Sequence, residues 1–175
     1  MNNRILSNDV IVLRPVEPFD ADYMWTVEND SLQWIQNSIV APFSRENLIQ
    51  YASSYDADPF SAKQLRLIIT DRSDRKIGIA DLFEISPQHR TAKVGIYILP
   101  SCRCSGFALS ALSLLEDYAS RLLNLRSLCA DIIEGNDESL NLFLKAGYIL
   151  RGTLTDWILS GRETFSLNIL QKTLL

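Results

Sequence analysis

Residues 96–119, IYILPSCRCSGFALSALSLLEDYA, join an apolar run to a helical pattern through a short loop that contains Arg103 and Gly106. The apolar run predicts a strand that ends at Leu99 and Pro100. The residues after Gly106 predict an amphipathic helix over residues 107–122, because apolar side chains recur there at helical spacing. These apolar positions are Ala108, Ala111, Leu112, Leu115, Ala119 and Leu122. A strand, a tight loop and a helix N-terminus leave several backbone N–H groups available to an anion.

The residues of the loop suit a pyrophosphate. Gly106 lets the backbone approach an anion closely, Ala108 keeps the first helical turn small, and the Arg103 guanidinium can bind two phosphate oxygens. An ordinary turn glycine and a solvated arginine would explain the same residues equally well. The loop alone therefore leaves open both a pyrophosphate site and a plain turn.

The composition predicts an ordinary globular protein. The chain has 175 residues, which suits a single domain over residues 1–175, and 47% of them are hydrophobic while 22% are charged. A formal net charge of −4 and a pI near 5.0 argue against a nucleic-acid partner, because such surfaces carry an excess of basic residues.

The N-terminal letters MNNRILSNDVIVLRP lack the apolar core of a signal peptide, and no apolar run is long enough to cross a bilayer. We therefore expect a cytoplasmic protein with no membrane partner. The three cysteines, Cys102, Cys104 and Cys129, are an odd number without framework spacing, so we expect free thiols. His89 is the only histidine, which leaves too few ligands for tetrahedral zinc, and we expect no metal.

Periodicity and turn signals predict the order βααβββαβαββ. Ser44 and Asn47 form a partial capping pattern, Gly147 closes a helix, and Ser160 with Gly161 turns the last hairpin. Gly95 interrupts a strand, where glycine often marks a bulge or a close approach of another backbone. The predicted strands are 9–16, 64–70, 76–85, 92–99, 126–133, 148–159 and 163–170, and the predicted helices are 18–35, 44–55, 107–122 and 136–147.

Two segments together resemble a known family. RCSGFA, residues 103–108, is similar to the acetyl-CoA signature of the GNAT-type N-acetyltransferases, and NDESLNLFLKAGY, residues 136–148, is similar to their second signature. VLRPVEPFDADYMW, LFEISPQHRTAKVGIYI and GYILRGTL extend the resemblance over nearly the whole chain. It is greatest for the branch that holds spermidine and ribosomal-protein alanine N-acetyltransferases, and EISPQHR favours the polyamine enzymes.

The resemblance implies the GNAT fold of the α/β (α+β) class. This fold has a central mixed, mostly antiparallel sheet of about seven strands flanked by about four helices. One strand pair splays apart, and the pantetheine arm enters the gap, which here would lie between residues 93–99 and 126–133. Gly95 would then be the bulge that helps to open the gap.

The resemblance also implies acetyl-CoA or coenzyme A as the cofactor. Ile98 and Leu99 would offer backbone hydrogen bonds to it, Asn136 would contact the pantetheine arm, and Ser139 would lie near the cofactor. Asn136 also suits a helix N-cap, and both roles stay open. The residues expected to line the pyrophosphate are Arg103, Cys104, Ser105, Gly106, Phe107 and Ala108.

Acetylation of an amine needs a group that accepts a proton and one that returns a proton to the leaving thiolate. The family's usual acid is a tyrosine, and this chain has Phe143 there, which cannot donate a proton. Lys93 stands where related alanine acetyltransferases carry a glutamate, which leaves Glu84 as the predicted base; a solvent-facing role for Glu84 is an equal alternative. Tyr97, Tyr148, Cys129 and water stay open as proton donors.

The expected reaction is direct attack of a primary amine on acetyl-CoA, with a polyamine such as spermidine or a peptide N-terminus as acceptor. Glu28 and Asp30, with Asp56 and Asp58 further away, would attract such a cation, although acidic loops are often only solvated. Trp25 and Trp34 would line the slot or pack in the core. A homo-oligomer is compatible with the resemblance. Phe143 and Lys93 motivate the alternative of an acyl-CoA-binding module without catalysis.

Overall fold

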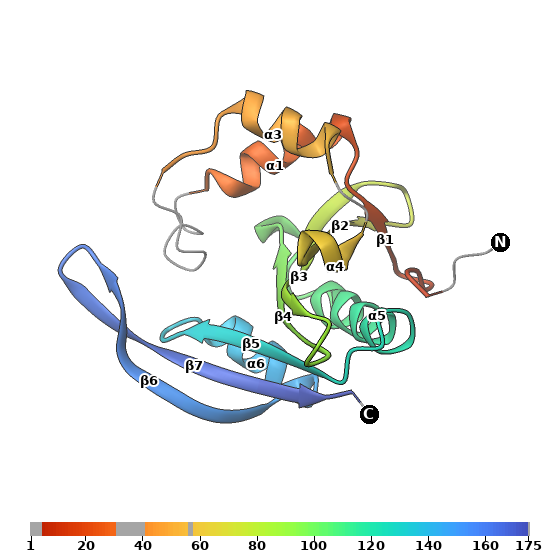
Figure 1. The fold of residues 1–175 in the computed structure, drawn as a ribbon. Coiled ribbons are helices and arrows are strands. Elements are labelled where there is room, and N and C mark those ends of the chain that lie inside the picture. The colour runs from red at the N-terminus through yellow and green to blue at the C-terminus, as the bar shows by residue number, and fades with distance from the viewer. Residues whose placement is uncertain (1–4, 31–40, 56–57, 175) are drawn as a thin grey trace.

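The computed structural model describes residues 5–30, 41–55 and 58–174, which form a mixed α/β fold around one seven-stranded sheet with the strand order β1-β2-β3-β4-β5-β7-β6 (Figure 1). Only β4 and β5 pair in parallel, and the other neighbours are antiparallel. The strands are β1 (Ile11–Pro15), β2 (Gln64–Asp71), β3 (Lys76–Ser86), β4 (Thr91–Ile98), β5 (Ser127–Ile133), β6 (Ile149–Ser160) and β7 (Glu163–Thr173).

Helices cover the sheet on both faces. The α-helices are α1 (Ala21–Glu28), α3 (Arg45–Ser53), α4 (Pro59–Ala62), α5 (Phe107–Arg121) and α6 (Asp137–Lys145), and the 3₁₀ turns are η1 (Pro18–Asp20) and η2 (Pro100–Cys102). Among the described residues, none of these helices is long and apolar enough to span a membrane.

Strand alternation divides the buried side chains between two cores. Leu67 and Ile69 of β2 join the larger core with α5 and α6, whereas Ile68 between them joins a smaller core with α1 and α3. The helices α1 and α3 therefore cover the β2–β3 side of one face. In Figure 1 the long β6–β7 hairpin lies at the lower left, on the other side of β5 from β4.

Local capping signals predicted two helix ends correctly. The Ser44 hydroxyl accepts a hydrogen bond from the Asn47 amide at 3.0 Å and caps α3. Gly147 follows α6 with a φ of +89°, the left-handed conformation that ends many helices. The sequence did not predict α4, which is a single turn. Of the predicted helix 18–35, the first turn is the 3₁₀ turn η1 and α1 ends at Glu28; residues 31–35 lie outside the described residues.

The pairing of β4 with β5 is short. It joins Thr91 to Ser127, Ala92 to Leu128 and Lys93 to Cys129, and no later residue of β4 pairs with β5. The two strands therefore splay apart beyond Lys93, at the place that the sequence resemblance predicted.

The bulge beside this splay lies on β3 rather than at Gly95. Gly95 pairs regularly with Asp81, so the prediction of a bulge at Gly95 is wrong. The register of β3 and β4 instead shifts between Phe83 and Ser86, where Glu84 adopts a φ of +49°. A bulge of this kind turns a side chain away from its usual alternation.

Candidate active site

The N-terminus of α5 is built to receive an anion. Gly106 is the N-cap residue with a φ of +79°, and no side chain caps the helix. The first amides of an α-helix have no intrahelical acceptor, so those of α5 stay available. A Cβ at Gly106 would meet no atom within 4 Å, which leaves open space in front of the turn. These features fit the pyrophosphate of acetyl-CoA.

Residues 103–108, which the sequence predicts to line the pyrophosphate, are called the cradle below. Four of them besides Arg103 flank Gly106 or the turn it makes. Cys104 and Ser105 are exposed, and Cys104 has a φ of +59°. Phe107 and Ala108 are half-buried and pack against the larger core. The loop is therefore anchored by its second half and exposes its first half to solvent.

Arg103 already has partners in the chain. Its Nε donates to the Ile98 carbonyl at 3.2 Å, and its Nη1 binds Glu138 Oε2 at 3.1 Å. The guanidinium thereby links the end of β4 to the first turn of α6. Binding of a phosphate by Arg103 would exchange Glu138, an exposed partner, for the phosphate.

The backbone groups at the end of β4 differ in availability. The Leu99 amide donates to the Ile77 carbonyl at 2.9 Å, and the Leu99 carbonyl accepts from the Cys102 amide at 2.8 Å. Leu99 is therefore largely committed to the fold. The Ile98 carbonyl accepts from the Arg103 side chain, and an amide of the cofactor can replace that side chain.

Asn136 has the capping role that its sequence position allowed. Its Oδ1 accepts from the Ser139 amide at 3.2 Å and caps α6. Both predicted residues thus lie together at the N-terminus of a helix that packs against β5. A contact of Asn136 or Ser139 with the cofactor stays a prediction.

Phe143 lies in the core. It is 3% exposed and packs against Tyr148, which is 2% exposed. Burial raises the pKa of Tyr148 far above its ordinary value, so its hydroxyl keeps its proton. The hydroxyl is thus a weak acid, and a role for Tyr148 as proton donor stays a prediction. Tyr97 instead packs against the smaller core on the α1–α3 face, and burial also raises its pKa.

A cluster of charged side chains, called the apex cluster below, lies at the point where β4 and β5 begin to separate. Lys93 Nζ binds Glu84 Oε1 at 2.9 Å and Asp131 Oδ2 at 2.9 Å, so one ammonium links β3, β4 and β5. Burial lowers the pKa of Lys93, but the hydrogen bonds from the two carboxylates outweigh it and raise the pKa overall. The expected repulsion between Lys93 and a cationic acceptor is thus offset by two anions.

The sequence prediction missed Asp131. Its neighbour Cys129 lies across the last β4–β5 pair, and Cys129 Sγ donates to Asp131 Oδ1 at 3.7 Å. Burial, followed by the Asp131 charge, raises the pKa of the Cys129 thiol to about 11. The alternation in SLCADII was the available signal, because it sets Cys129 and Asp131 on the face opposite Leu128, Ala130 and Ile132.

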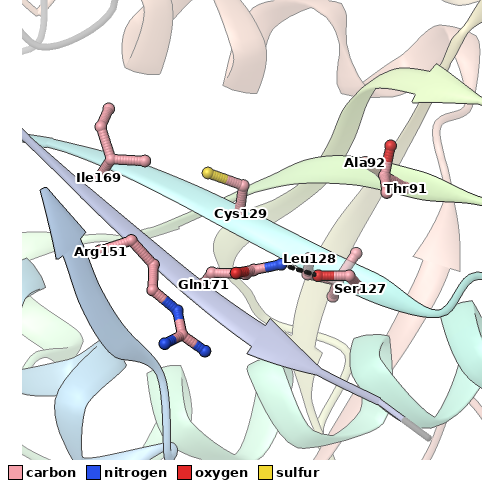
Figure 2. Close-up of a pocket in the computed structure, with 8 residues that line it drawn as sticks. All are labelled: Thr91, Ala92, Ser127, Leu128, Cys129, Arg151, Ile169 and Gln171. Carbon is pink, nitrogen blue, oxygen red and sulfur yellow. Dashed lines mark hydrogen bonds between the residues drawn. The ribbon is translucent and has the colours of Figure 1, made fainter. Parts of the chain in front are cut away.

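A cavity of about 300 Å³ lies beside this apex, over the paired part of β4 and β5 (Figure 2). Figure 2 shows Cys129 of β5 among residues from β4, β6 and β7, with Gln171 donating to the Ser127 hydroxyl at 2.9 Å. The cavity is lined by Thr91, Ala92, Ser127, Leu128, Cys129, Arg151, Ile169 and Gln171.

The two predicted acceptor-binding acids differ. Glu28 is 8% exposed, and Arg66 binds both Glu28 and Asp81, so Glu28 is part of a buried ion network and not an open acidic wall. The sequence did not reveal this pairing, because Arg66 is 38 residues away along the chain. Binding of the acceptor by Glu28 stays a prediction. Asp30 follows α1 and is half-buried. Trp25 stacks with the Arg45 guanidinium, and Trp34 and Asp56 lie outside the described residues.

Comparison with known proteins agrees with this geometry. The family model "Acetyltransferase (GNAT) domain" matches residues 11–149. A spermidine N(1)-acetyltransferase of Escherichia coli K12 is 26% identical over 147 residues, which cover 82% of this chain and 75% of that protein. A spermidine N(1)-acetyltransferase of Vibrio cholerae is 24% identical over 159 residues, which cover 89% and 88%.

A solved structure has the same fold. The spermidine N-acetyltransferase from Vibrio cholerae, in complex with CoA and spermine, superposes with a TM-score of 0.82 at 22% identity and covers 95% of this chain and 96% of that one. The splayed strands, the uncapped helix N-terminus and the family match lead to one assignment: the chain belongs to the GNAT family of acetyltransferases, which use acetyl-CoA.

Proposed function

We propose that this protein transfers the acetyl group of acetyl-CoA to a primary amine of a polyamine such as spermidine. The observation that carries the proposal is the Glu84–Lys93–Asp131 cluster, which sets two carboxylates and one ammonium at the apex of the splay. Its net charge of about −1 favours a cationic acceptor. The curated relatives in Escherichia coli and Vibrio cholerae are named for the same substrate.

The chain's own residues would hold the cofactor at two places. The amides around Gly106 would bind its pyrophosphate, and the Ile98 carbonyl would accept a hydrogen bond from the arm in the β4–β5 gap. Acetyl-CoA supplies an activated acyl group, so the chain needs only to orient an amine and move a proton. Attack by the amine itself needs no covalent intermediate on the protein.

A protein or peptide N-terminus is the second acceptor class, since it is also a primary amine. A binding module without catalysis is the alternative from another class. Phe143 had motivated that alternative, but Phe143 is a core residue on the α5–α6 face, so its identity does not argue against turnover.

The assembly and the compartment are also proposals. A dodecameric structure exists for a spermidine N-acetyltransferase from Vibrio cholerae, and β6 of this chain exposes Ile149, Leu150, Leu154, Trp157 and Leu159, so we expect a homo-oligomer. Free Cys102, Cys104 and Cys129 favour the reducing cytoplasm. We expect the chain to act as a single domain, since one sheet runs through it.

The decisive experiment is an assay of thiol release from acetyl-CoA against spermidine, spermine, peptides with N-terminal alanine or serine, aminoglycosides and free amino acids. Release that depends on spermidine or spermine, with the acetylated product identified by mass, supports the proposal. Release with the peptides alone assigns the other acceptor class. Binding of CoA by calorimetry, without release for any amine, supports the binding module.

A further inference from the structure

Where β4 and β5 separate, the carboxylate of Asp131 lies at the edge of the gap between the two strands. Asp131 comes two residues after Cys129 on β5, and Cys129 is paired with Lys93. Continuing that register by two residues sets Asp131 across the gap from Gly95. We infer that Asp131 is the residue that binds the acceptor's ammonium group and accepts its proton during transfer, and that Lys93 is the residue that positions Asp131. This inference rests on the proposed function.

The strand opposite leaves room for an amine. Gly95 has no side chain, and a Cβ there would meet only the Phe83 ring, at 3.6 Å. No β4 side chain therefore covers the Asp131 carboxylate at that register position. The Asp131 side chain is 24% exposed, so it is accessible but partly shielded from water, which strengthens its attraction for a cation.

Glu84 is aimed by the bulge. Phe83 pairs with Lys93, so the next residue of a regular strand would point to the opposite face. The left-handed conformation of Glu84 instead turns its carboxylate to Lys93. Glu84 therefore fixes the ammonium from the β3 side, and Lys93 lies between Glu84 and the β5 strand that carries Asp131.

Lys93 occupies one side of Asp131 and leaves the other for substrate. The ammonium binds Oδ2, whereas within the described part of the chain Oδ1 has only the weak thiol donor of Cys129 at 3.7 Å. A carboxylate oxygen accepts more than one hydrogen bond, so Oδ1 has capacity for the acceptor nitrogen. This arrangement fixes the orientation of the carboxylate before substrate arrives.

The proton balance is simple. The acceptor ammonium first loses one proton to water, and the neutral nitrogen then forms a C–N bond with the thioester carbonyl carbon. As the C–S bond breaks, its electron pair leaves on sulfur and the second nitrogen proton passes to Asp131. The thiolate takes a proton from water, and Asp131 later returns its own proton to water.

The test compares Asp131→Asn with Glu84→Gln, a matched removal of the other carboxylate of the cluster. With spermidine and acetyl-CoA, Asp131→Asn should lower kcat/KM by about 100-fold, whereas Glu84→Gln should lower it by less than about 5-fold because Glu84 is 63% exposed. Calorimetry should give an unchanged Kd for CoA in both variants, and spermidine should bind the CoA complex much more weakly in Asp131→Asn than in Glu84→Gln, which only lowers the net negative charge of the cluster.

Lys93 gives a second, separate signature. Lys93→Met raises the net negative charge but releases Asp131, so kcat should fall about 10-fold while KM for spermidine does not rise. Lys93→Arg should restore kcat to within about 3-fold of the wild type, because it keeps the bridging cation. General damage to the fold would raise KM and weaken CoA binding in both variants.

The outcomes separate the two claims. Wild-type turnover of a polyamine with equal losses in Asp131→Asn and Glu84→Gln overturns the inference and leaves the proposed function standing. A wild type that neither acetylates nor binds a polyamine in its CoA complex overturns both. Equal kcat in Lys93→Met and the wild type overturns the positioning role of Lys93.

Discussion

Phe143 packs edge to face against Tyr148, with ring centroids 4.9 Å apart and an interplanar angle of 81°. Both rings belong to the core that α5 and α6 form on one face of the sheet. Cys129 and Asp131 alternate with core residues of β5 and so lie on the opposite face. The residue that replaces the family's usual acid is thus separated from the apex cluster by the sheet.

We therefore expect Phe143→Tyr to impair folding without helping catalysis. The new hydroxyl would be buried, and its desolvation should lower the free energy of unfolding by about 1–3 kcal/mol. Urea unfolding measures this loss, and the pH profile of kcat should keep its wild-type shape. Tyr148→Phe is the control: its hydroxyl lies near Glu116 without a hydrogen bond of good geometry, so the change should stay below about 1 kcal/mol. A raised kcat in Phe143→Tyr would contradict the core assignment.

Gly106→Glu tests the pyrophosphate cradle. The substitution places a carboxylate in the open space before α5 and forces a left-handed φ on a non-glycine residue, so the Kd for acetyl-CoA should rise at least about 100-fold. Gly161→Glu is matched, because Gly161 also has a positive φ, +63°, and open space, but it lies in the β6–β7 turn. Calorimetry should show normal cofactor affinity for Gly161→Glu. Equal affinities of Gly106→Glu and Gly161→Glu for acetyl-CoA would contradict the binding of its pyrophosphate at residues 103–108.

Local features of this fold were predictable because nearby residues determine them. Ser44 caps α3 through an amide three residues away, and Gly106 joins β4 to α5 through its own backbone conformation. The alternation of β5 also carried the information that Cys129 and Asp131 share a face. The strand, the loop and the helix N-terminus that would hold the cofactor were accordingly predictable from the sequence.

The charge partners were not predictable, because they depend on tertiary packing. Glu28 looked like an exposed acid at a helix end until Arg66, on β2, placed it in a buried network. The direction of Glu84 depended on a bulge that the letters of β3 do not reveal, since φ is positive there without a glycine. From the sequence, Lys93 was expected to repel a cationic acceptor. In the structure its ammonium instead links the carboxylates of Glu84 and Asp131.

Asp20 should make stability depend on acid pH. Burial alone would raise its pKa, but hydrogen bonds from Arg14, Lys76 and the Glu17 amide outweigh burial and lower the pKa from 3.8 to about 2. A lowered folded-state pKa gives stability that is present above the unfolded-state value and is lost as pH falls from about 4 through 2. The loss should be about 2 kcal/mol.

Urea unfolding from pH 7 to pH 2 measures this dependence. Asp20→Asn should remove the loss between pH 4 and 2, at the expense of stability at pH 7, because Arg14 and Lys76 lose a fully buried partner. Asp22→Asn is the control on the same segment, since the Asp22 side chain is 78% exposed. Equal losses of the free energy of unfolding between pH 4 and pH 2 in the wild type and in Asp20→Asn would contradict the lowered pKa of Asp20.

The Cys129 thiol reports on the apex cluster without any cofactor. Burial is the main reason that its pKa is raised to about 11, the Asp131 charge adds to it, and Lys93 opposes it. Asp131→Asn should therefore lower the pKa and Lys93→Met should raise it further. Below the pKa, the thiolate fraction changes tenfold for each unit, so alkylation near pH 8.5 should be about tenfold faster in Asp131→Asn and several-fold slower in Lys93→Met.

The measurement is best made in a Cys104→Ser background, because Cys104 is the exposed thiol and Cys102 is buried. Glu84→Gln should accelerate alkylation only slightly, since Glu84 reaches Cys129 only as the weakest of these charges. Arg151, which lines the cavity beside Cys129, stays constant in every variant. Equal alkylation rates in all four proteins would mean that Asp131 and Lys93 do not control the charge at the apex. A graded order instead places the Asp131 carboxylate against Cys129 in solution, at the edge of the β4–β5 gap.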